Sequence, residues 1–127
     1  MIDALFNQTN YVATKKMLDA TALRHEAIAS NLANIETPNY KRIDVAPSFQ
    51  AELASAMGSK DVAKITSVSL KLAEDQNAVS ANRDGNTVQL ESELMKLNQN
   101  TLAHTLETQL VTGTLLKLRL AITGRPS

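Results

Sequence analysis

Side chains recur at steps of three and four along both ends of this chain, and this rhythm limits the fold more than any other feature of the sequence. Over residues 2–33 and just beyond, one seam follows the rhythm: Tyr11, Thr14, Leu18, Thr21, His25, Ile28, Leu32 and Ile35. Such spacing places side chains on one face of an α-helix, as in a coiled coil. A second stripe of small residues, Ala13, Ala20 and Ala27, allows another helix to approach closely. The pattern predicts one long N-terminal helix, which Pro38 prevents from continuing past Thr37.

Residues 87–122 predict a second long helix that carries two seams. The first seam comprises Leu90, Leu94, Leu97, Thr101, His104, Thr108, Val111, Leu115, Leu118 and Ile122. The second comprises Met95, Gln99, Leu102, Leu106, Gln109, Gly113, Leu116 and Leu120, with Gly113 as a point of close packing between helices. We expect Asn86 or Thr87 to cap the start of this helix and Gly124 to mark its end. A helix with two seams needs neighbours on two sides, so the N-terminal helix supplies one and another must come from elsewhere.

The middle of the chain, residues 39–86, has no long period. Ser48 is expected to cap a short helix over residues 49–57, and Gly58 is expected to end it. Apolar residues alternate loosely over residues 59–72, which fits either short strands or a mobile loop. The run Asp84-Gly85-Asn86 is a strong turn signal.

These patterns together predict a mainly α fold. The long N- and C-terminal helices are expected to pair as a coiled-coil inner domain, with an irregular middle segment that has room for a short helix and short strands. We divide the chain into an N-terminal axial helix (residues 1–37), a loop-rich middle segment (38–86) and a C-terminal axial helix (87–127), which form one structural unit.

The composition suits narrow helix–helix seams better than a broad core. Of the 127 residues, seventeen are Ala and seventeen are Leu, while aromatic residues make up only 3%. The formal net charge is zero and neither sign is clustered, so nothing indicates binding to nucleic acid. No run approaches the ~18 apolar residues of a membrane-spanning helix. Because Asp3 interrupts the first apolar residues, a cleaved signal peptide is not expected.

No catalytic, cofactor-binding or metal-binding residue is predicted, and an enzyme is not expected. His25 and His104 fall on seams and are interpreted as packed or interfacial histidines, since no spacing on either helix suits a metal. The polar residues between Asp75 and Asp84 lack the spacing of a calcium loop. The sequence has no cysteine, phosphate-binding loop, dinucleotide fingerprint or nucleophile elbow. The acidic residues of the C-terminal helix are interpreted as solubilising charges on its flanks: Glu91, Glu93 and Glu107.

One run at the end of the first helix, residues 29–40, is richer than a helix stop requires. Asparagine is a poor residue inside a helix because its side chain competes for backbone hydrogen bonds. The run nevertheless has Asn31 and Asn34 three positions apart, just before Thr37-Pro38. An ordinary helix stop remains one interpretation. The other is a corner of specified geometry, in which the two asparagines hold loop backbone and Pro38 directs the chain outward.

The run resembles the N-terminal signature of the bacterial flagellar rod and hook axial proteins. That signature is Ala-x-Asn-Leu-Ala-Asn, followed by a Thr and a Gly- or Asn-aromatic pair, and this chain reads Ala29-Ser30-Asn31-Leu32-Ala33-Asn34 and then Thr37-Pro38-Asn39-Tyr40. The Thr-Pro-Asn-Tyr variant is most similar to rod proteins of the proximal end. The stretches 84–91 and 115–124, and the short length, also resemble a proximal rod protein. The Glu-Ala-x-Arg-Ala-Tyr type of motif usual near the C-terminus of the sister protein FlgC is missing.

The resemblance implies a structural subunit of the flagellar basal body, in which many copies stack into a hollow shaft across the periplasm. It implies association with itself, with FlgC-, FlgF- and FlgG-type rod proteins, with FliE, and with the membrane ring and the flagellar type III export gate. Such a subunit links the ring and gate to the rest of the rod, helps to transmit torque, and is exported without a cleaved signal peptide. It also implies no cofactor, no nucleic acid and no direct membrane insertion.

Two sets of residues are expected to carry assembly. The motif set is Asn31, Leu32, Ala33, Asn34, Thr37, Pro38 and Tyr40. The interface seams are represented by Leu18, Ile28, Leu90, Leu94, Leu97, Leu102, Leu106, Val111, Leu115 and Leu118. The alternatives at this point are a FlgC-like proximal rod protein and a soluble coiled-coil adaptor or secretion chaperone. A rod-associated hydrolase is a more distant alternative, since it needs placed carboxylates or metal ligands and the sequence shows none.

Overall fold

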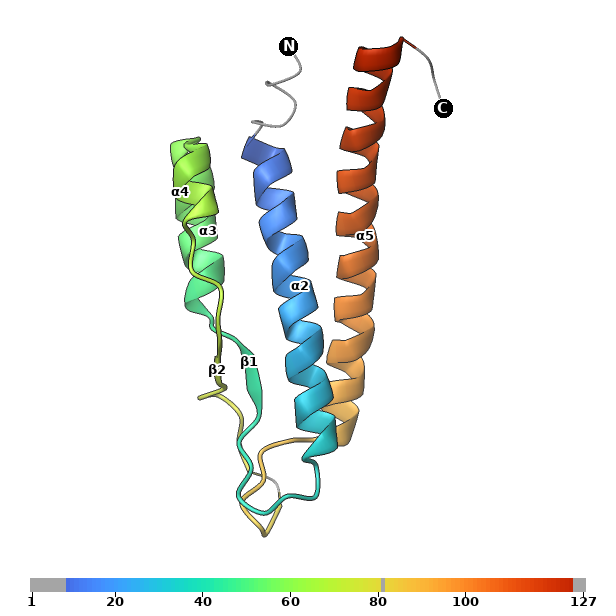
Figure 1. The fold of residues 1–127 in the computed structure, drawn as a ribbon. Helices are drawn as coiled ribbons and strands as arrows, with labels where there is room; N and C mark the ends of the chain where they lie inside the picture. The colour runs from blue at the N-terminus through green and yellow to red at the C-terminus, as the bar shows by residue number, and fades with distance from the viewer. Residues whose placement is uncertain (1–8, 81, 125–127) are drawn as a thin grey trace.

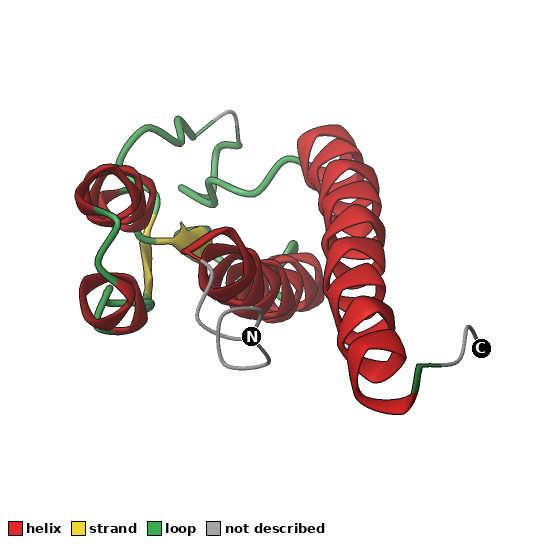
Figure 2. Ribbon diagram, turned by 90° about the horizontal axis from the view of Figure 1, so that it is seen from above, coloured by secondary structure: helices red, strands yellow, loops and turns green. Residues whose placement is uncertain are grey.

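The computed structural model describes residues 9–80 and 82–124. The elements, in chain order, are α2 (Thr9–Ala33), β1 (Ile43–Val45), α3 (Ser48–Ser59), α4 (Val62–Thr66), β2 (Leu72–Glu74) and α5 (Leu90–Thr123). Helix α2 lies in the centre, with α5 running antiparallel along one side and α3 and α4 on the other (Figures 1 and 2). The predicted mainly α fold, with two long paired helices and a middle segment of short elements, is confirmed.

Helix α2 ends at Ala33, where the sequence predicted its end. The N–H of Asn34 still donates to the carbonyl of Ser30, and the N–H of Thr37 then donates to the carbonyl of Asn34, so the chain leaves the helix through tight turns. Pro38 follows and cannot continue a helix. The predicted start near Ile2 lies outside the described residues.

The apolar core lies between α2 and the middle segment. Ala13 and Ala20 of α2 are almost fully buried, and their small side chains let the short helices approach closely. The residues packed around them are Val45, Phe49, Leu53, Ala56, Ile65 and Val68. Ala27, the third member of the predicted stripe, is also fully buried. Ala13 and Ala20 therefore provide the close approach that the sequence predicted, and the helices that approach them are α3 and α4.

The two strands form an antiparallel pair, with Ile43 opposite Glu74 and Val45 opposite Leu72. The pairing is extended at both ends, because the N–H of Asp75 donates to the Arg42 carbonyl and the N–H of Ala46 donates to the Lys71 carbonyl. This small sheet holds the middle segment along the flank of α2.

Several predicted helix ends are wrong in detail. Helix α3 begins at Ser48 itself, after Pro47, and no side chain caps it. It continues through Gly58 and ends where Lys60 takes a left-handed conformation (φ 54°) and donates its N–H to the Met57 carbonyl. Because Lys60 provides the left-handed position, the glycine is not needed as a stop.

The stretch 59–72, predicted to form either short strands or a mobile loop, contains helix α4. Asp61 caps this helix by accepting the N–H of Ala63 at 3.0 Å. Val62, Ile65 and Val68 are three residues apart, which is a helical spacing as well as part of a loose alternation. In the second half of the stretch, Leu72 does begin a strand.

The predicted caps of the C-terminal helix are half right. Gln89 precedes α5 and makes no side-chain capping bond, so neither Asn86 nor Thr87 caps it. Gly124 ends it as predicted, with φ 67° and its N–H donated to the Leu120 carbonyl. Within residues 9–80 and 82–124, no helix is both long enough and apolar enough to span a membrane.

Candidate assembly site

The buried side chain of Asn31 ties the end of α2 to strand β1. Its amide oxygen accepts the N–H of Ile43 at 2.9 Å, and its amide nitrogen donates to the Ile43 carbonyl, also at 2.9 Å. Both backbone groups of Ile43 are thus satisfied by one side chain, as they would be by a neighbouring strand. The Tyr40 hydroxyl donates to the same amide oxygen at 3.2 Å and lies 3.0 Å from the Ser30 hydroxyl. Asn31 therefore fixes how the chain leaves α2.

A second buried asparagine, Asn86, closes the corner from the far end of the middle segment. Its amide donates to the carbonyls of Asn34 at 2.9 Å, Ile35 at 3.1 Å and Thr37 at 2.8 Å. Asn34 in turn donates to the Ser30 carbonyl and accepts from the Thr37 hydroxyl. The turn after α2 is consequently wrapped around one amide group from the segment that leads into α5.

The predicted turn before α5 is present, and it requires glycine at position 85. Gly85 has φ 80°, and a Cβ on this residue would lie 2.5 Å from the Oδ1 of Asn39. Asn39 itself has φ 59° and donates its N–H to the Asp84 carbonyl at 2.9 Å. Only glycine combines this backbone angle with such a close neighbour.

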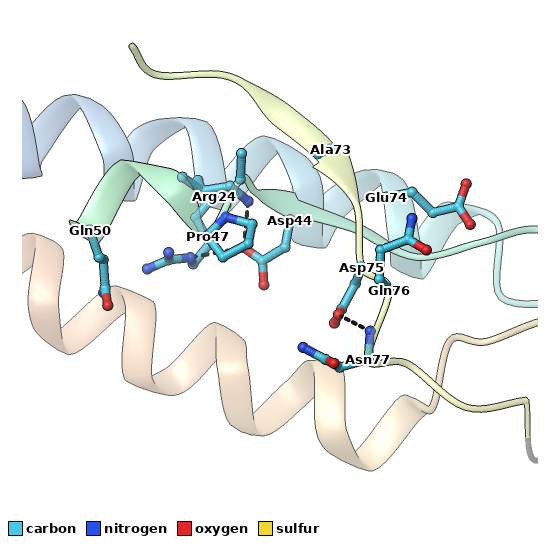
Figure 3. A pocket seen from close by; sticks show the side chains of 11 residues that line it. Arg24, Asp44, Pro47, Gln50, Ala73, Glu74, Asp75, Gln76 and Asn77 are labelled. Atoms are coloured by element: carbon cyan, nitrogen blue, oxygen red, sulfur yellow. Dashed lines mark hydrogen bonds and ion pairs between the residues drawn. The ribbon is translucent and has the colours of Figure 1, made fainter. Parts of the chain in front are cut away.

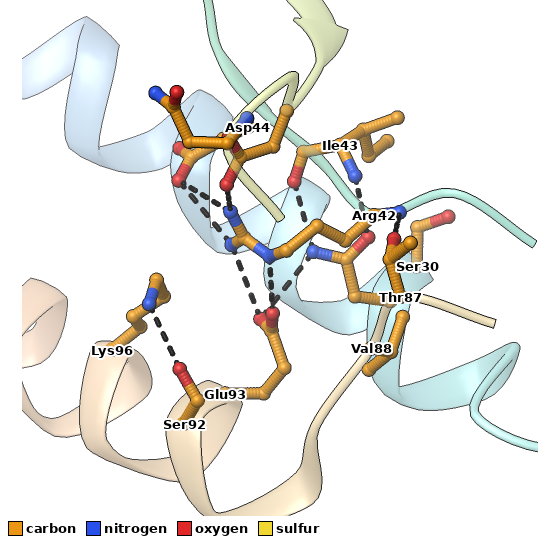
Figure 4. Close-up of polar contacts among 12 residues, drawn as sticks. Ser30, Arg42, Ile43, Asp44, Thr87, Val88, Ser92, Glu93 and Lys96 are labelled. Carbon is orange, nitrogen blue, oxygen red and sulfur yellow. Dashed lines mark hydrogen bonds and ion pairs between the residues drawn. The ribbon is translucent and has the colours of Figure 1, made fainter. Parts of the chain in front are cut away.

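Arg42 is the centre of a buried ion cluster that joins the middle segment to α5. The Arg42 cluster comprises Arg42, Glu93, Asp75, Asp44 and Arg24. The Nε of Arg42 lies 2.5 Å from Glu93, and its Nη1 lies 2.5 Å from Asp75 and 3.3 Å from Asp44 (Figure 4). Arg24 of α2 pairs with Asp44 at 3.0 Å. Glu93 is fully buried, so Arg42 and Asn31 are what make its charge tolerable there.

The cluster shifts the ionisation of its members in the expected directions. Burial alone lowers the pKa of Arg42, but hydrogen bonds to Glu93 and Asp75 and the charges of Glu93 and Asp44 raise this pKa above its ordinary value. Burial raises the pKa of Asp75, but the hydrogen bond from Arg42, the N–H of Asn77 and the charges of Arg42 and Lys96 lower this pKa overall. Both shifts favour the charged forms, so Arg42 and Asp75 are charged at neutral pH.

Polar residues, not leucines, form the centre of the seam between α2 and α5. Glu93, Asn100 and Glu107 are spaced seven apart and are all buried. Asn100 donates to the Thr21 carbonyl at 2.8 Å, and the Thr21 hydroxyl donates to Glu107 at 2.9 Å. The same hydroxyl lies 3.1 Å from Nδ1 of His104. These polar positions set the orientation of α5, because each has its partner on α2 or beside it.

The opposite face of α5 is apolar, and no other part of residues 9–80 and 82–124 covers it. Leu102 follows Glu93 by nine residues, about two and a half helical turns, so it points away from α2. Leu102 is 75% exposed and Leu106 is 59% exposed. The other exposed large apolar residues of α5 are Leu90, Leu94, Met95, Leu110, Leu115, Leu116, Leu120 and Ile122. We call Met95, Leu102, Leu106, Leu116 and Leu120 the outer face; all belong to the second predicted seam.

A hollow of about 480 Å³ lies beside the Arg42 cluster, between β1, the start of α3 and the chain after β2 (Figure 3). Two of its three carboxylates are engaged: Asp44 pairs with Arg24, and Asp75 pairs with Arg42 and accepts the N–H of Asn77. Within the described part of the chain, no group of His, Asp and Glu is arranged to hold a metal ion. The third carboxylate, Glu74, is exposed to solvent at the edge of the hollow.

The motif residues predicted from the sequence are gathered at the corner after α2. Asn31, Asn34, Thr37 and Tyr40 all take part in the hydrogen bonds described above. Leu32 is half-buried, whereas Ala33 and Pro38 are exposed.

The predicted interface seams are divided by the structure. Ile28 and Leu118 are buried, and Leu18, Leu97 and Val111 are half-buried. The exposed members are Leu90, Leu94, Leu102, Leu106 and Leu115. The seam facing α2 is rotated from the first predicted seam, because the polar residues at 93, 100 and 107 replace leucines at its centre.

The interpretation of Glu93 and Glu107 is wrong, whereas those of His25 and Gly113 concern contacts that this single chain does not make. Glu93 and Glu107 are buried members of the helix pair and not solubilising charges; only Glu91 is exposed. His25 is exposed and does not pack in the seam. A Cβ on Gly113 would meet no atom within 4 Å, so this glycine is not a close-packing point inside the chain.

Four features of the site were not predicted from the sequence: the role of Arg42, the hydrogen bonds of Thr21, the donation by Asn86 at the corner, and the polar seam. A signal was available for the seam, since Glu93, Asn100 and Glu107 repeat at intervals of seven within a segment of few charges. Arg42 and Asn86 carried no such periodic signal, because Arg42 meets Glu93 across 51 residues of the chain and Asn86 meets Asn34 across 52.

Comparison with known proteins matches this chain to one family. The model of a family described as flagella basal body rod protein matches residues 18–41, which include the whole corner motif. The flagellar basal body rod protein FlgB of Aquifex aeolicus is 32% identical over 113 residues, which cover 87% of this chain and 90% of that protein. FlgB of Borrelia hermsii is 32% identical over 115 residues, covering 75% and 82%. FlgB of Cereibacter sphaeroides is 34% identical over 109 residues, covering 80% and 84%.

Proposed function

This chain belongs to the FlgB family of flagellar basal body rod proteins, and we propose that it builds the proximal part of the rod by packing the outer face of α5 against helices of neighbouring subunits. As a structural component of the basal body rod, it has no need of a catalytic centre. In the proximal position it joins the membrane ring and export gate to the next rod segment. Its partners there are further copies of itself, FliE, and rod proteins of the FlgC, FlgF and FlgG type. It reaches the periplasm through the flagellar type III apparatus.

The observation that carries this proposal is the inverted polarity of α5. A helix of a self-sufficient protein buries its apolar face and exposes its polar face. Here Glu93, Asn100 and Glu107 are buried against α2, while Leu102 and Leu106 are left in water. Fully burying one leucine side chain is worth about 1.5–3 kcal/mol. The outer face therefore supplies a driving force that the single chain does not use.

The corner motif suits the same role. Asn31 and Asn86 hold the turn after α2 through bonds to backbone atoms, so the corner keeps its shape without a large core. Arg42 then fastens the middle segment to the start of α5. A subunit fastened in this way keeps its middle segment in place on the helix pair, which suits a part that transmits torque.

A complementation experiment tests the proposal. The variant Leu102→Asp/Leu106→Asp is expressed in a motile bacterium that lacks its own copy of this gene. We expect loss of motility and of assembled rods, because a charge buried in a desolvated seam costs several kcal/mol. The free variant should retain the helical content and unfolding midpoint of the parent chain, since both side chains are exposed within it.

The control is Ser55→Asp, which adds one of the same acidic side chains at an exposed position of α3 and should leave motility intact. Normal motility of the double variant would overturn the proposal. The adaptor or chaperone alternative is tested in the same strains, because an adaptor would be absent from purified basal bodies and a rod subunit would be present.

A further inference from the structure

A shallow apolar groove crosses α2 between α3 and α5. Its volume is about 430 Å³, and its lining includes Met17, Ala20, Leu53, Ala54, Met57 and Ala103. Two charged residues also line it, but both are engaged within the chain. Arg24 pairs with Asp44 at 3.0 Å, and Glu107 accepts the Thr21 hydroxyl at 2.9 Å. The groove thus presents an apolar floor with no charge that needs a partner from outside.

The middle of α5 is a surface of matching chemistry. Residues 97–116 contain one residue among Asp, Glu, Lys and Arg, and that residue is Glu107, which is turned inward and buried. We call the outward side of this stretch the uncharged belt; Leu102 and Leu106 are its most exposed leucines. Gly113 lies within the stretch and has open space where a Cβ would be. The exposed side of α2, by contrast, carries Lys15, Asp19 and Glu26.

We propose that the uncharged belt of one copy docks its leucines into the apolar groove of the next copy. This inference rests on the proposed function and specifies which two surfaces of the subunit meet. A helix bearing charges would lose their hydration in the groove without gaining a partner, since Arg24 and Glu107 are already paired. The belt brings leucine side chains and no charge, so it enters without that cost.

The consequence is a contact that propagates. Consecutive residues of a helix point about 100° apart, so Leu102 of the belt and Ala103 of the groove face different directions. Each copy can therefore offer its belt to one neighbour and its groove to another. Contacts between two different surfaces give open helical arrays unless the rotation closes them into a ring. A belt packed on another belt would instead give closed dimers, which cannot extend.

Disulfide trapping distinguishes these arrangements, because the parent chain contains no cysteine. Ala54→Cys labels the groove and Leu102→Cys labels the belt. The two full-length variants are co-expressed in the complemented strain, and isolated basal bodies are oxidised. Ser55→Cys, an exposed neighbour on α3 outside the groove lining, replaces Ala54→Cys as the matched control.

We expect roughly tenfold more 54–102 product than 55–102 product, because a disulfide forms only when the two Cα atoms come within about 7 Å. A chain carrying both Ala54→Cys and Leu102→Cys should give a ladder of oligomers. Three results would each overturn this docking. They are equal yields of the 54–102 and 55–102 products, no 54–102 product, and a yield of 102–102 product as high as that of 54–102.

The test separates the two proposals. If the cysteine variants swim and assemble but fail to link, only the docking of belt into groove is wrong. If Leu102→Asp/Leu106→Asp also swims, the proposed function fails with it.

Discussion

The two sides of α2 are held by different kinds of interaction. On one side, Ala20 packs with Phe49, Leu53 and Ile65 in an apolar core. On the other, Thr21 bonds with residues of α5, and the Arg42 cluster fastens the start of that helix. Apolar burial stabilises without requiring one alignment, whereas buried polar groups permit only the alignment that pairs them. The side facing α5 is therefore specific but contributes less burial, and the leucines of α5 remain available for other chains.

The Arg42 cluster decides the register of α5. Glu93, Asn100 and Glu107 repeat at equal intervals, so a slip of one heptad would bring another polar residue into each position. Only Glu93, however, has the charge and place to meet Arg42 at 2.5 Å while accepting from Asn31. A slipped helix would separate Arg42 from Glu93 and leave each of these two buried charges without its partner.

The largest loss in the free energy of unfolding is expected from Arg42→Met. The substitution leaves the buried charge of Glu93 without its cation, and removing one partner of a buried pair costs about 3–5 kcal/mol. Urea unfolding of the purified chain, followed by circular dichroism, measures the loss. Arg83→Met, the same change at an exposed arginine, is the control. A loss below that of the control would mean that the polar side contributes nothing to stability.

A somewhat smaller effect is expected on the apolar side from Leu53→Ala. Leu53 is 6% exposed in the core beside Ala20, and truncating a buried leucine costs about 2–5 kcal/mol. Leu102→Ala is the matched control, since the same truncation at a 75% exposed site should leave the free chain unchanged. If both variants lose equal stability, the outer face is covered in the free chain and the comparison between the sides of α2 fails.

Asn100→Leu is expected to change stability little and in the opposite direction. The amide of Asn100 donates to the Thr21 carbonyl, but its oxygen has no partner within the described part of the chain. Exchanging one hydrogen bond for buried apolar surface should raise the free energy of unfolding by about 1 kcal/mol. Asn98→Leu, at an exposed position, controls for helix propensity. A clear destabilisation would show that the polar seam stabilises as well as aligns.

The smallest effect is expected from acid acting on Asp75. Because its pKa is lowered in the folded chain, its contribution to stability is complete above the unfolded pKa and is lost as the pH falls through the folded value. The unfolding midpoint should therefore begin to drop as the pH falls toward the unfolded Asp pKa near 3.9, and it should keep dropping until the pH passes the lower folded value. Asp75→Asn should reduce that drop. An unchanged pH profile in the variant would remove Asp75 from the Arg42 cluster as a stabilising member.

Much of the fold could be predicted from the sequence, because its signals are local. Periodicity located both long helices, and Pro38 and Gly124 marked their ends. The corner motif was also visible, since Asn31, Asn34 and Thr37 lie within one short run. The ends of α3 and the existence of α4 were missed. Lys60 ends α3 in a left-handed conformation and Asp61 caps α4, and both are ordinary residue types whose conformations only packing selects.

By itself, the sequence determined that α5 has two faces needing cover, that the chain turns sharply after Ala33, and that its family is recognisable from residues 28–42. Which face of α5 meets α2 depends on contacts between distant parts of the chain. Leucine periodicity favoured one seam, but Glu93, Asn100 and Glu107 have partners only on the α2 side, and a buried polar group must be paired. Since those partners are 51 to 86 residues away in the chain, no local pattern could reveal them. The leucines were therefore turned outward by the need to satisfy polar groups inside.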